Sequence, residues 1–202
     1  MASKQKPAAA TEDAIKLLMQ DHKRVKGLFE EFQKFQDADQ EGYETLKQEL
    51  MDAVCSELKI HAAVEEEIFY PAARGALPNE EDLLNEAEVE HAGAKDLIRQ
   101  IECGSASDPM TCARFTVLGE QIDHHVGEEE GDMFPKVRKS KLDLERLGRK
   151  MAARKEELKA EMGITPFDEE GDDGKTGEKV PSLWERLRSM TGTSRADGMN
   201  GR

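Results

Sequence analysis

The chain lacks several features that mark well-known classes of protein. Its 202 residues contain three cysteines, an odd number without a CxxC pair, so neither a disulfide framework nor a thiolate metal site is expected. It has no run of about 18 apolar residues, and its first residues do not form the apolar segment of a signal peptide. We therefore expect a cytoplasmic protein, without a membrane partner, whose reduced cysteines lie in the core.

The chain also has fewer positive than negative residues. It contains 29 Lys and Arg and 43 Asp and Glu residues, which gives a net charge of −14. Binding to nucleic acid or to an anionic membrane without sequence specificity requires a basic face, so no nucleic acid is expected as a partner. The sequence contains no GxSxG, no P-loop, no HExxH and no GxGxxG followed by an acidic residue. The reactions associated with those motifs are not expected.

Aromatic residues make up only 5% of the chain, whereas Ala, Leu, Glu, Lys and Met, which favour helices, are frequent. Apolar residues recur every three or four positions in four segments, which is typical of helices that bury one face. Thr11 is the expected N-cap of the first helix, and the second and fourth are expected to stop near Pro71 and Pro135. Four such helices joined by short breaks predict an all-α, antiparallel up-down four-helix bundle.

The sequence also predicts how the chain is divided. The expected parts are a flexible N-terminus (1–10), the bundle (11–138), a charged accessory helix (140–162) and a mostly disordered C-terminal tail (163–202). Ser140 and Asp143 have the spacing of a capping box for the accessory helix. The tail is rich in Gly and charge, and its SLWERLRSM stretch is either flexible or a docking element for an unknown protein partner.

Histidines occupy the apolar stripes of all four predicted helices: His22, His61, His91 and His125. Two of them begin an eleven-residue stretch that occurs twice, HAAVEEEIFYP and HVGEEEGDMFP. In both copies a glutamate follows four residues later, so Glu65 and Glu129 share a helical face with His61 and His125. His124 is rotated by about 100° from that face and is expected beside the site.

Such a cluster of imidazoles and carboxylates cannot be buried without compensation, since an unpaired ionised group costs several kcal/mol in a protein interior. A purely structural hydrogen-bonded network is one alternative. Two metal ions explain the repeat more directly, because each copy supplies one histidine and one carboxylate, and His22 and His91 complete the two halves. Imidazole and carboxylate without thiolate suit iron or manganese, and zinc is compatible with the same ligands.

The order His22, His61-x-x-x-Glu65, His91 and His125-x-x-x-Glu129, with the continuations EEEIFYP and EEEGDMFP, resembles the hemerythrin HHE cation-binding domain over about residues 11–138. The resemblance implies a non-haem di-iron centre in the bundle core, with two iron ions joined by an oxo or hydroxo bridge and by carboxylates. The metal ligands that it implies are His22, His61, Glu65, His91, His125 and Glu129. Glu65 and Glu129 are the implied bridges.

One helix departs from the oxygen-carrying hemerythrins, whose third helix bears a second ligand histidine one turn from the first. The corresponding positions are Ala87 and Lys95. A five-histidine oxygen-carrier site is therefore not expected unless His124 or Tyr70 supplies the missing ligand. For Tyr70 the alternatives are a phenolate bound to iron and an aromatic ring that packs beside Pro71.

The residues around these ligands carry two further predictions. Five phenylalanines are expected to wall the site: Phe29, Phe32, Phe69, Phe115 and Phe134. Four glutamates are expected on helical faces turned away from the stripe, as a solvated acidic surface or as a path for iron entry: Glu66, Glu67, Glu128 and Glu130.

Three functions are consistent with these expectations. The first is binding or sensing of a small ligand, O2, NO or peroxide, at an open iron position. The second is a di-iron enzyme that degrades peroxide or nitric oxide. The third is storage or delivery of iron. The sequence does not decide whether the protein is an enzyme.

Overall fold

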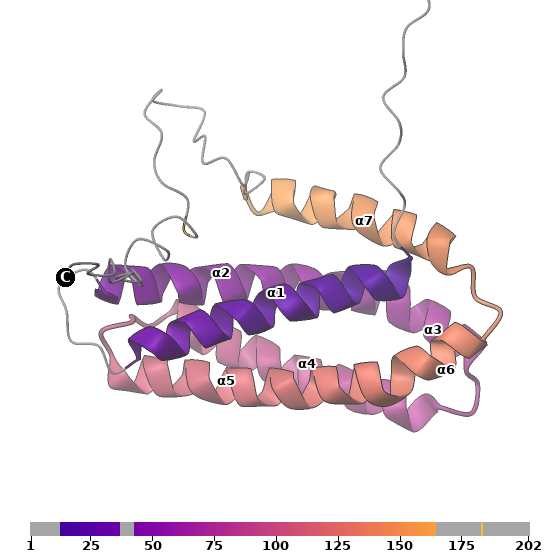
Figure 1. Ribbon diagram of the computed structural model, residues 1–202, viewed down its shortest axis with the longest axis horizontal. Helices are drawn as coiled ribbons and strands as arrows, with labels where there is room; N and C mark the ends of the chain where they lie inside the picture. Colours follow the sequence, from indigo (N-terminus) through magenta and orange to yellow (C-terminus); the bar gives the residue numbers. More distant parts are fainter. Residues whose placement is uncertain (1–12, 37–42, 165–182, 184–202) are drawn as a thin grey trace, which may run out of the picture. The chain divides into compact units, whose positions relative to one another are not determined.

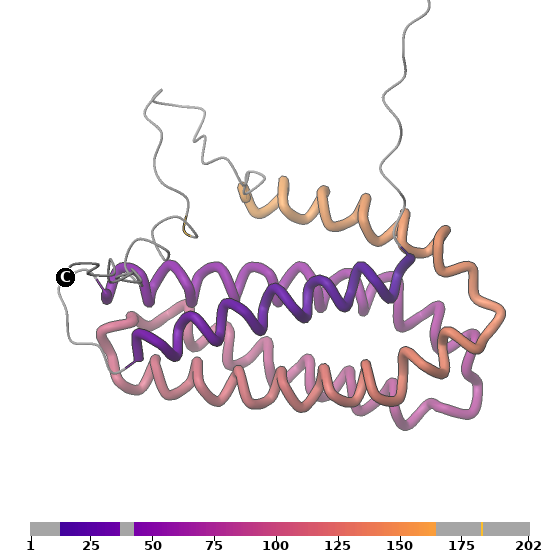
Figure 2. Tube along the Cα trace, in the orientation of Figure 1, coloured from indigo at the N-terminus to yellow at the C-terminus, as the bar shows by residue number. Residues whose placement is uncertain are grey.

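The computed structural model describes residues 13–36, 43–164 and 183. Its four long helices are α1 (Ala14–Phe35), α2 (Tyr43–Val64), α4 (Glu81–Glu102) and α5 (Pro109–Glu128). Helix α1 packs against α2 and α4 against α5, while α2 also contacts α4 and α1 contacts α5 (Figures 1 and 2). The predicted all-α four-helix bundle is confirmed.

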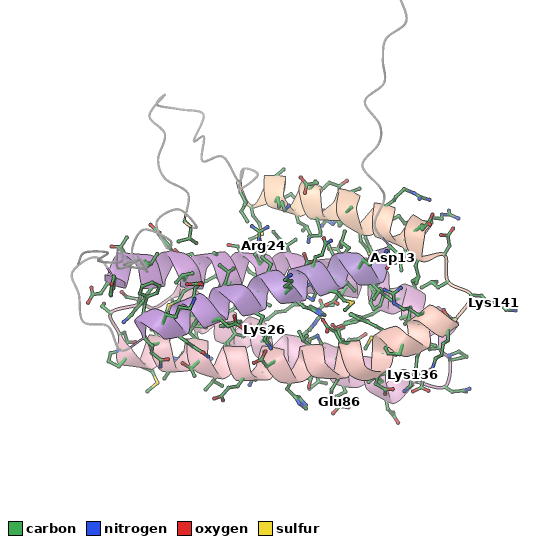
Figure 3. The ribbon with its side chains drawn as sticks, viewed as in Figure 1. Asp13, Arg24, Lys26, Glu86, Lys136 and Lys141 are labelled. Carbon is green, nitrogen blue, oxygen red and sulfur yellow. The ribbon has the colours of Figure 1, made fainter. Side chains whose placement is uncertain are left out.

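The buried faces of these helices follow the apolar stripes, and charged side chains such as Lys26, Glu86 and Lys141 project outward (Figure 3). Helix α1 begins after Asp13, whose carboxylate accepts a hydrogen bond of 2.9 Å from the backbone N–H of Lys16. Thr11, the expected cap, lies outside the described residues. Asp13 caps the helix because its carboxylate is placed to satisfy a backbone donor of the first turn.

The sequence predicted that the second and fourth helices stop near Pro71 and Pro135, and this prediction is wrong. Each instead passes through a π-helical turn and continues, through η1 (Glu65–Phe69) into α3 (Tyr70–Ala76) and through η2 (Glu129–Met133) into α6 (Phe134–Lys139). The backbone N–H of Tyr70 bonds to the carbonyl of Glu65 five residues earlier. Phe134 repeats this bond to Glu129.

The prolines explain where the wide turns form. A proline inside a helix has no N–H to donate, and its ring crowds the carbonyl four residues earlier. That carbonyl belongs to Glu67 for Pro71 and to Gly131 for Pro135, so in both repeats it lies inside the π-helical turn. The helix widens rather than ends, and it moves the following side chains to a new position around its axis.

Helix α7 (Leu144–Glu161) lies against α1, α2 and η1, and buries Leu147 and Met151 (Figure 1). The predicted capping box is wrong, because Asp143 itself caps α7 through the N–H of Arg146 at 2.9 Å. Ser140 instead ends α6, where its hydroxyl donates to the carbonyl of Val137 at 2.7 Å. After α7, Gly163 has a φ of 67°, a left-handed conformation that glycine adopts without a steric penalty.

Two other expectations concern cysteines and chain ends. All three cysteines are free thiols, but only Cys55 is buried, while Cys112 is partly buried and Cys103 is exposed. The core placement was therefore correct for Cys55 alone.

The predicted flexible segment 1–10 and most of the tail 163–202 lie outside the described residues. Within the described part of the chain, no helix combines the length and the hydrophobicity needed to cross a membrane.

Candidate metal centre

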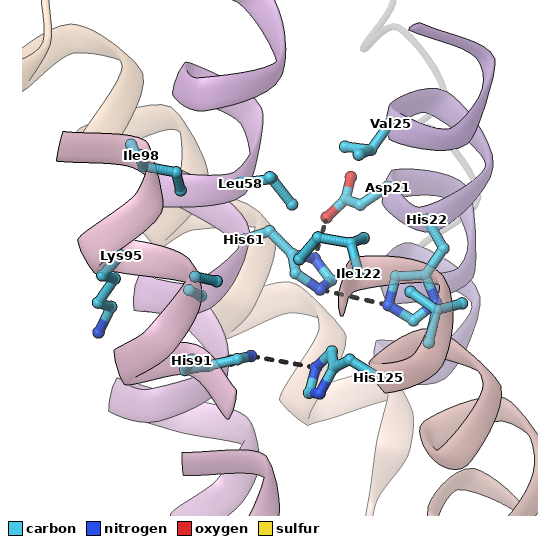
Figure 4. A pocket seen from close by; sticks show the side chains of 13 residues that line it. Asp21, His22, Val25, Leu58, His61, His91, Lys95, Ile98, Ile122 and His125 are labelled. Atoms are coloured by element: carbon cyan, nitrogen blue, oxygen red, sulfur yellow. Dashed lines mark hydrogen bonds and ion pairs between the residues drawn. The ribbon is translucent and has the colours of Figure 1, made fainter. Parts of the chain in front are cut away.

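Each of the four bundle helices contributes one buried histidine to the same layer of the core. The Nε2 atoms of His22 and His61 lie 3.2 Å apart, and those of His91 and His125 lie 3.1 Å apart (Figure 4). The stripes alone predict that these side chains face inward, and the packing of the helices places them at the same level. Their Nε2 atoms therefore point into one shared space.

Glu65 and Glu129 belong to the same layer, and each is the first residue of a π-helical turn. Glu65 Oε2 lies 3.1 Å from His61 Nε2 and 3.4 Å from His91 Nε2. Glu129 Oε2 lies 3.2 Å from His22 Nε2 and 3.6 Å from His125 Nε2. Each carboxylate therefore lies between a histidine of the α1–α2 pair and a histidine of the α4–α5 pair. Both carboxylates are almost completely buried.

The donor atoms of this cluster fit a cation better than they fit one another. Both oxygens of Glu65 and Oε2 of Glu129 accept no hydrogen bond from any described residue, although they are buried. When the single proton of each neutral imidazole is on Nδ1, both Nε2 atoms of a facing pair carry lone pairs, and neither can donate to the other or to a glutamate. Buried acceptors without donors are rare in native proteins, and a bound cation would satisfy all of them.

The atoms divide into two overlapping groups in which all potential ligands lie within 4.8 Å of one another. We call them the first half-site (His22, His61, Glu65 and Glu129) and the second half-site (Glu65, His91 and His125). The structure thus brings all six predicted ligands together. Because Glu65 belongs to both groups, it is placed to bridge two ions.

A second layer of carboxylates holds the other nitrogen of every inner histidine. The Nδ1 contacts are His22 with Glu130 at 2.9 Å, His61 with Asp21 at 3.3 Å, His91 with Glu66 at 3.0 Å and His125 with Glu90 at 2.7 Å. A carboxylate at Nδ1 fixes the tautomer that leaves Nε2 free for a metal and orients the ring. This arrangement is typical of histidine ligands.

This second layer corrects one prediction and adds residues that the sequence had not suggested. Glu66 and Glu130 were expected on solvated faces, but each bonds to a histidine of another helix, and each is the second residue of a π-helical turn. Asp21 and Glu90 had not been considered. A signal for both exists in the sequence, since each directly precedes one of the two histidines outside the HxxxE repeats.

The remaining residues of this region lie outside the cluster. Glu67 is exposed and pairs with Arg154 at 2.7 Å. The side chain of His124 is 65% exposed and lies 3.6 Å from Glu90 and 3.4 Å from Glu128. His124 is therefore beside the site, as expected, and does not replace a ligand.

Comparison with known proteins agrees with this geometry. The family model described as the hemerythrin HHE cation-binding domain matches residues 13–137. The chain belongs to this family. A solved HHE cation-binding domain-containing protein, the Rv2633c homolog from Mycobacterium kansasii, is similar to it with 26% identity and a TM-score of 0.59. That similarity covers 88% of this chain and 99% of the mycobacterial chain.

A curated relative from Nostoc sp., named a DNA nickase, is 32% identical over 127 residues. These residues make up 63% of this chain, but the match spans only 33% of the Nostoc protein. The matched segment therefore spans about a third of the length of that relative.

Tyr70 contacts the HHE centre through its hydroxyl. Its hydroxyl donates to Glu129 Oε1 at 3.0 Å and lies 3.2 Å from His91 Nε2. Burial, together with the charges of Glu65 and Glu129, raises the pKa of this phenol well above its ordinary value. Without metal, Tyr70 is thus a neutral donor, and its role extends beyond packing against Pro71.

The five phenylalanines do not all wall the HHE centre. The ring of Phe134 stacks on His22 with centroids 5.7 Å apart, and Phe69 packs edge-on against Phe134 at 5.6 Å. Phe115 instead packs with Phe29 at 4.8 Å and with Phe32 at 4.5 Å. These last three form a separate cluster, and none lines the pocket at the histidines.

An apolar pocket lies beside the histidines, where α1, α2, α4 and α5 supply Val25, Leu58, Ala94, Ile98 and Ile122 (Figure 4). These residues lie one or two turns from the histidines, on the side away from Glu65 and Glu129. Lys95 reaches the rim but its ammonium binds Glu66 at 2.5 Å, and Ala87 belongs to the apolar core. Neither position replaces the missing histidine.

Charge is distributed unevenly in the metal-free centre. Burial alone would lower the pKa of His61, but Glu65 and Asp21 raise it to about 10. Burial would raise the pKa of Glu129, but hydrogen bonding and the charges of the histidines lower it to about 2. Burial lowers the pKa of His91. Protonated His61 therefore neutralises part of the carboxylate charge until a cation takes its place.

Proposed function

We propose that this HHE domain holds two iron ions and binds a small ligand, O2, NO or peroxide, at an iron position that the protein leaves open. The observation that supports the proposal is the pair of overlapping half-sites that share Glu65. Two histidines and a carboxylate with open positions form a ligand set that suits non-haem iron. When bound, the two irons would supply ligand binding and electron transfer.

The protein residues would prepare the site for this chemistry. The outer carboxylates hold the Nδ1 protons, so the Nε2 atoms remain free for metal. Apolar side chains such as Val25, Leu58 and Ile122 line the pocket beside the histidines. Such a lining favours a small uncharged molecule over water and over charged metabolites.

An enzyme that degrades peroxide or nitric oxide is the second candidate function. The position of the Tyr70 hydroxyl favours it. Reduction of peroxide or nitric oxide takes up protons as well as electrons, and a positioned acid is the usual source of the protons. The Tyr70 hydroxyl holds a proton between Glu129 and His91. In this alternative, Tyr70 would be a proton donor at the centre, through its contacts with Glu129 and His91.

The acidic composition of the chain also bears on its partners. The name DNA nickase belongs to a relative about three times as long as the matched segment. A net charge of −14 does not favour binding of DNA by this chain. We propose a small molecule rather than a nucleic acid as its partner.

The test is metal analysis of anaerobically purified protein, followed by optical spectra during addition of O2, NO and then hydrogen peroxide. We expect two irons per chain and a band that appears with the ligand and disappears when it is removed. Peroxide or NO consumed over many turnovers would favour the enzyme. Iron that passes readily to a chelator would favour storage or delivery, and a protein with zinc alone would contradict the iron proposal.

A further inference from the structure

One lysine of helix α7 contacts an outer carboxylate of the candidate metal centre. The ammonium of Lys155 contacts Asp21 Oδ1. The other oxygen of the same carboxylate, Oδ2, accepts from His61 Nδ1 at 3.3 Å. A continuous chain of contacts therefore runs from α7, through α1, to a histidine of the first half-site on α2.

Burial shows that this contact is more than an ordinary surface ion pair. The side chain of Lys155 is 12% exposed and that of Asp21 is 9% exposed. Lys155 follows Leu147 and Met151 at intervals of four residues, so it continues the buried stripe of α7 toward the bundle. An ion pair at this depth is screened much less by solvent than an exposed pair.

We propose that Lys155 is a positioning residue of the metal centre, which acts on His61 through Asp21. This inference rests on the proposed metal site and assigns part of its support to a helix that lies outside the matched family domain. Residues 13–137 contain every inner ligand and every outer carboxylate, but not Lys155. Attachment of α7 and metal binding in the first half-site are therefore coupled.

The physical reason lies in the two oxygens of Asp21. Lys155 occupies one oxygen and His61 the other, so the carboxylate cannot rotate without breaking a charge-assisted bond. This fixes the Nδ1 proton of His61 and the direction of its Nε2 atom.

The second half-site provides an internal comparison. Lys95 binds Glu66, and Glu66 in turn binds His91 Nδ1. The order lysine, carboxylate, histidine is the same, but Lys95 belongs to the bundle helix α4 and its side chain is 45% exposed. A change at Lys95 is thus expected to affect the second half-site and not the first.

The test compares zinc-loaded wild-type protein with Lys155→Met, Lys155→Arg, Arg154→Met and Lys95→Met. Zinc is diamagnetic, so the Nδ1 protons of His61 and His91 can be followed by NMR, while release of each zinc to a chelator gives rates. Lys155→Met keeps an unbranched side chain one atom shorter and without charge, and Lys155→Arg restores a cation. Arg154→Met removes the contact of α7 with Glu67 but leaves Asp21 paired.

In Lys155→Met we expect the His61 resonance to shift and one of two zinc ions to leave faster, on the order of 10-fold, as for other outer partners of metal ligands. Lys155→Arg should restore much of the wild-type behaviour. Lys95→Met should instead shift the His91 resonance and accelerate the other zinc ion.

Unchanged His61 resonance and release rates in Lys155→Met would overturn the inference. So would an equal effect of Arg154→Met, because α7 would then act only as a packed helix. Failure of the iron proposal is seen separately, in the metal content of the wild-type protein, since the zinc experiment depends only on the ligand set. A wild-type protein that binds fewer than two zinc ions would also overturn the inference.

Discussion

Tyr70 donates its hydroxyl proton to Glu129 across 59 residues of sequence, at 3.0 Å, and so links the two HxxxE repeats inside the core. The equivalent position of the second repeat is Phe134, which stacks on His22 and has no hydroxyl. The two half-sites therefore differ by one buried phenol. This asymmetry gives Glu129 of the first half-site a hydrogen-bond donor, and the same hydroxyl lies 3.2 Å from Nε2 of His91 in the second half-site.

Tyr70→Phe makes the two repeats more alike and removes this donor. We expect the metal-free protein to lose about 1–3 kcal/mol of stability, because Glu129 Oε1 loses a hydrogen bond to a charged acceptor. Urea unfolding in the presence of a chelator measures the loss. Tyr43→Phe is the control, since Tyr43 packs against Phe35 far from the centre; an equal loss in both variants would contradict the prediction.

The double variant His61→Ala with His125→Ala should no longer bind metal, because each half-site loses one of its two imidazoles. Metal analysis after purification in iron-containing medium measures this directly. His124→Ala should retain the wild-type metal content, since its exposed ring lies outside both half-sites. Stoichiometric iron in the double variant would refute the ligand assignment.

Glu66→Gln and Glu67→Gln change neighbouring glutamates that the sequence alone cannot distinguish. Glu66 holds Nδ1 of His91, whereas Glu67 pairs with Arg154 at the surface. Glu66→Gln should weaken metal binding by about 10-fold or more, and Glu67→Gln should leave it almost unchanged. Competition with a chelator of known affinity gives both values, and equal affinities would argue against a supporting role for Glu66.

The stability of the metal-free protein should depend on pH through His61. Its folded pKa, about 10, lies above the ordinary value of 6.5, so protonated His61 stabilises the fold fully below pH 6.5. That stability is lost as the pH rises from 6.5 through about 10. Melting curves in a chelator should show this loss, and His61→Gln should remove it; a flat profile in the wild-type protein would contradict the assignment.

Metal binding should have the opposite dependence, because an ion at His61 must displace its proton. Affinity is therefore expected to rise with pH over the range in which metal-free stability falls. Calorimetry in two buffers with different ionisation enthalpies measures the protons released. Binding without proton release at pH 7 would show that His61 is already neutral or is not a ligand.

Ala94→Leu tests the apolar pocket. The larger side chain enters space next to the histidines and should cost about 1–3 kcal/mol through overpacking, while both metals remain bound. Binding of O2 or NO should weaken because the ligand loses its space. Ala92→Leu, an exposed position on the same helix, is the matched control, and equal ligand affinities in the two variants would exclude this pocket as the binding site.

Several of these residues were predictable because their placement is a local property of the helix. A spacing of three and four residues puts His22, His91 and the two HxxxE pairs on buried faces whatever the neighbouring helices are. The same periodicity misplaced Glu66 and Glu130. Each is the second residue of a π-helical turn, where the angle between successive side chains differs from that of an α-helix.

The sequence by itself determined the four amphipathic helices, the inward direction of the six inner ligands and the acidic surface, since each depends on residue type and helical period. Tertiary structure decided which carboxylate holds which histidine, because Asp21, Glu66, Glu90 and Glu130 all reach across to another helix. It also decided that Lys155 lies on Asp21, 134 residues away. Contacts of this kind depend on how helices are aligned and rotated, which only their packing fixes.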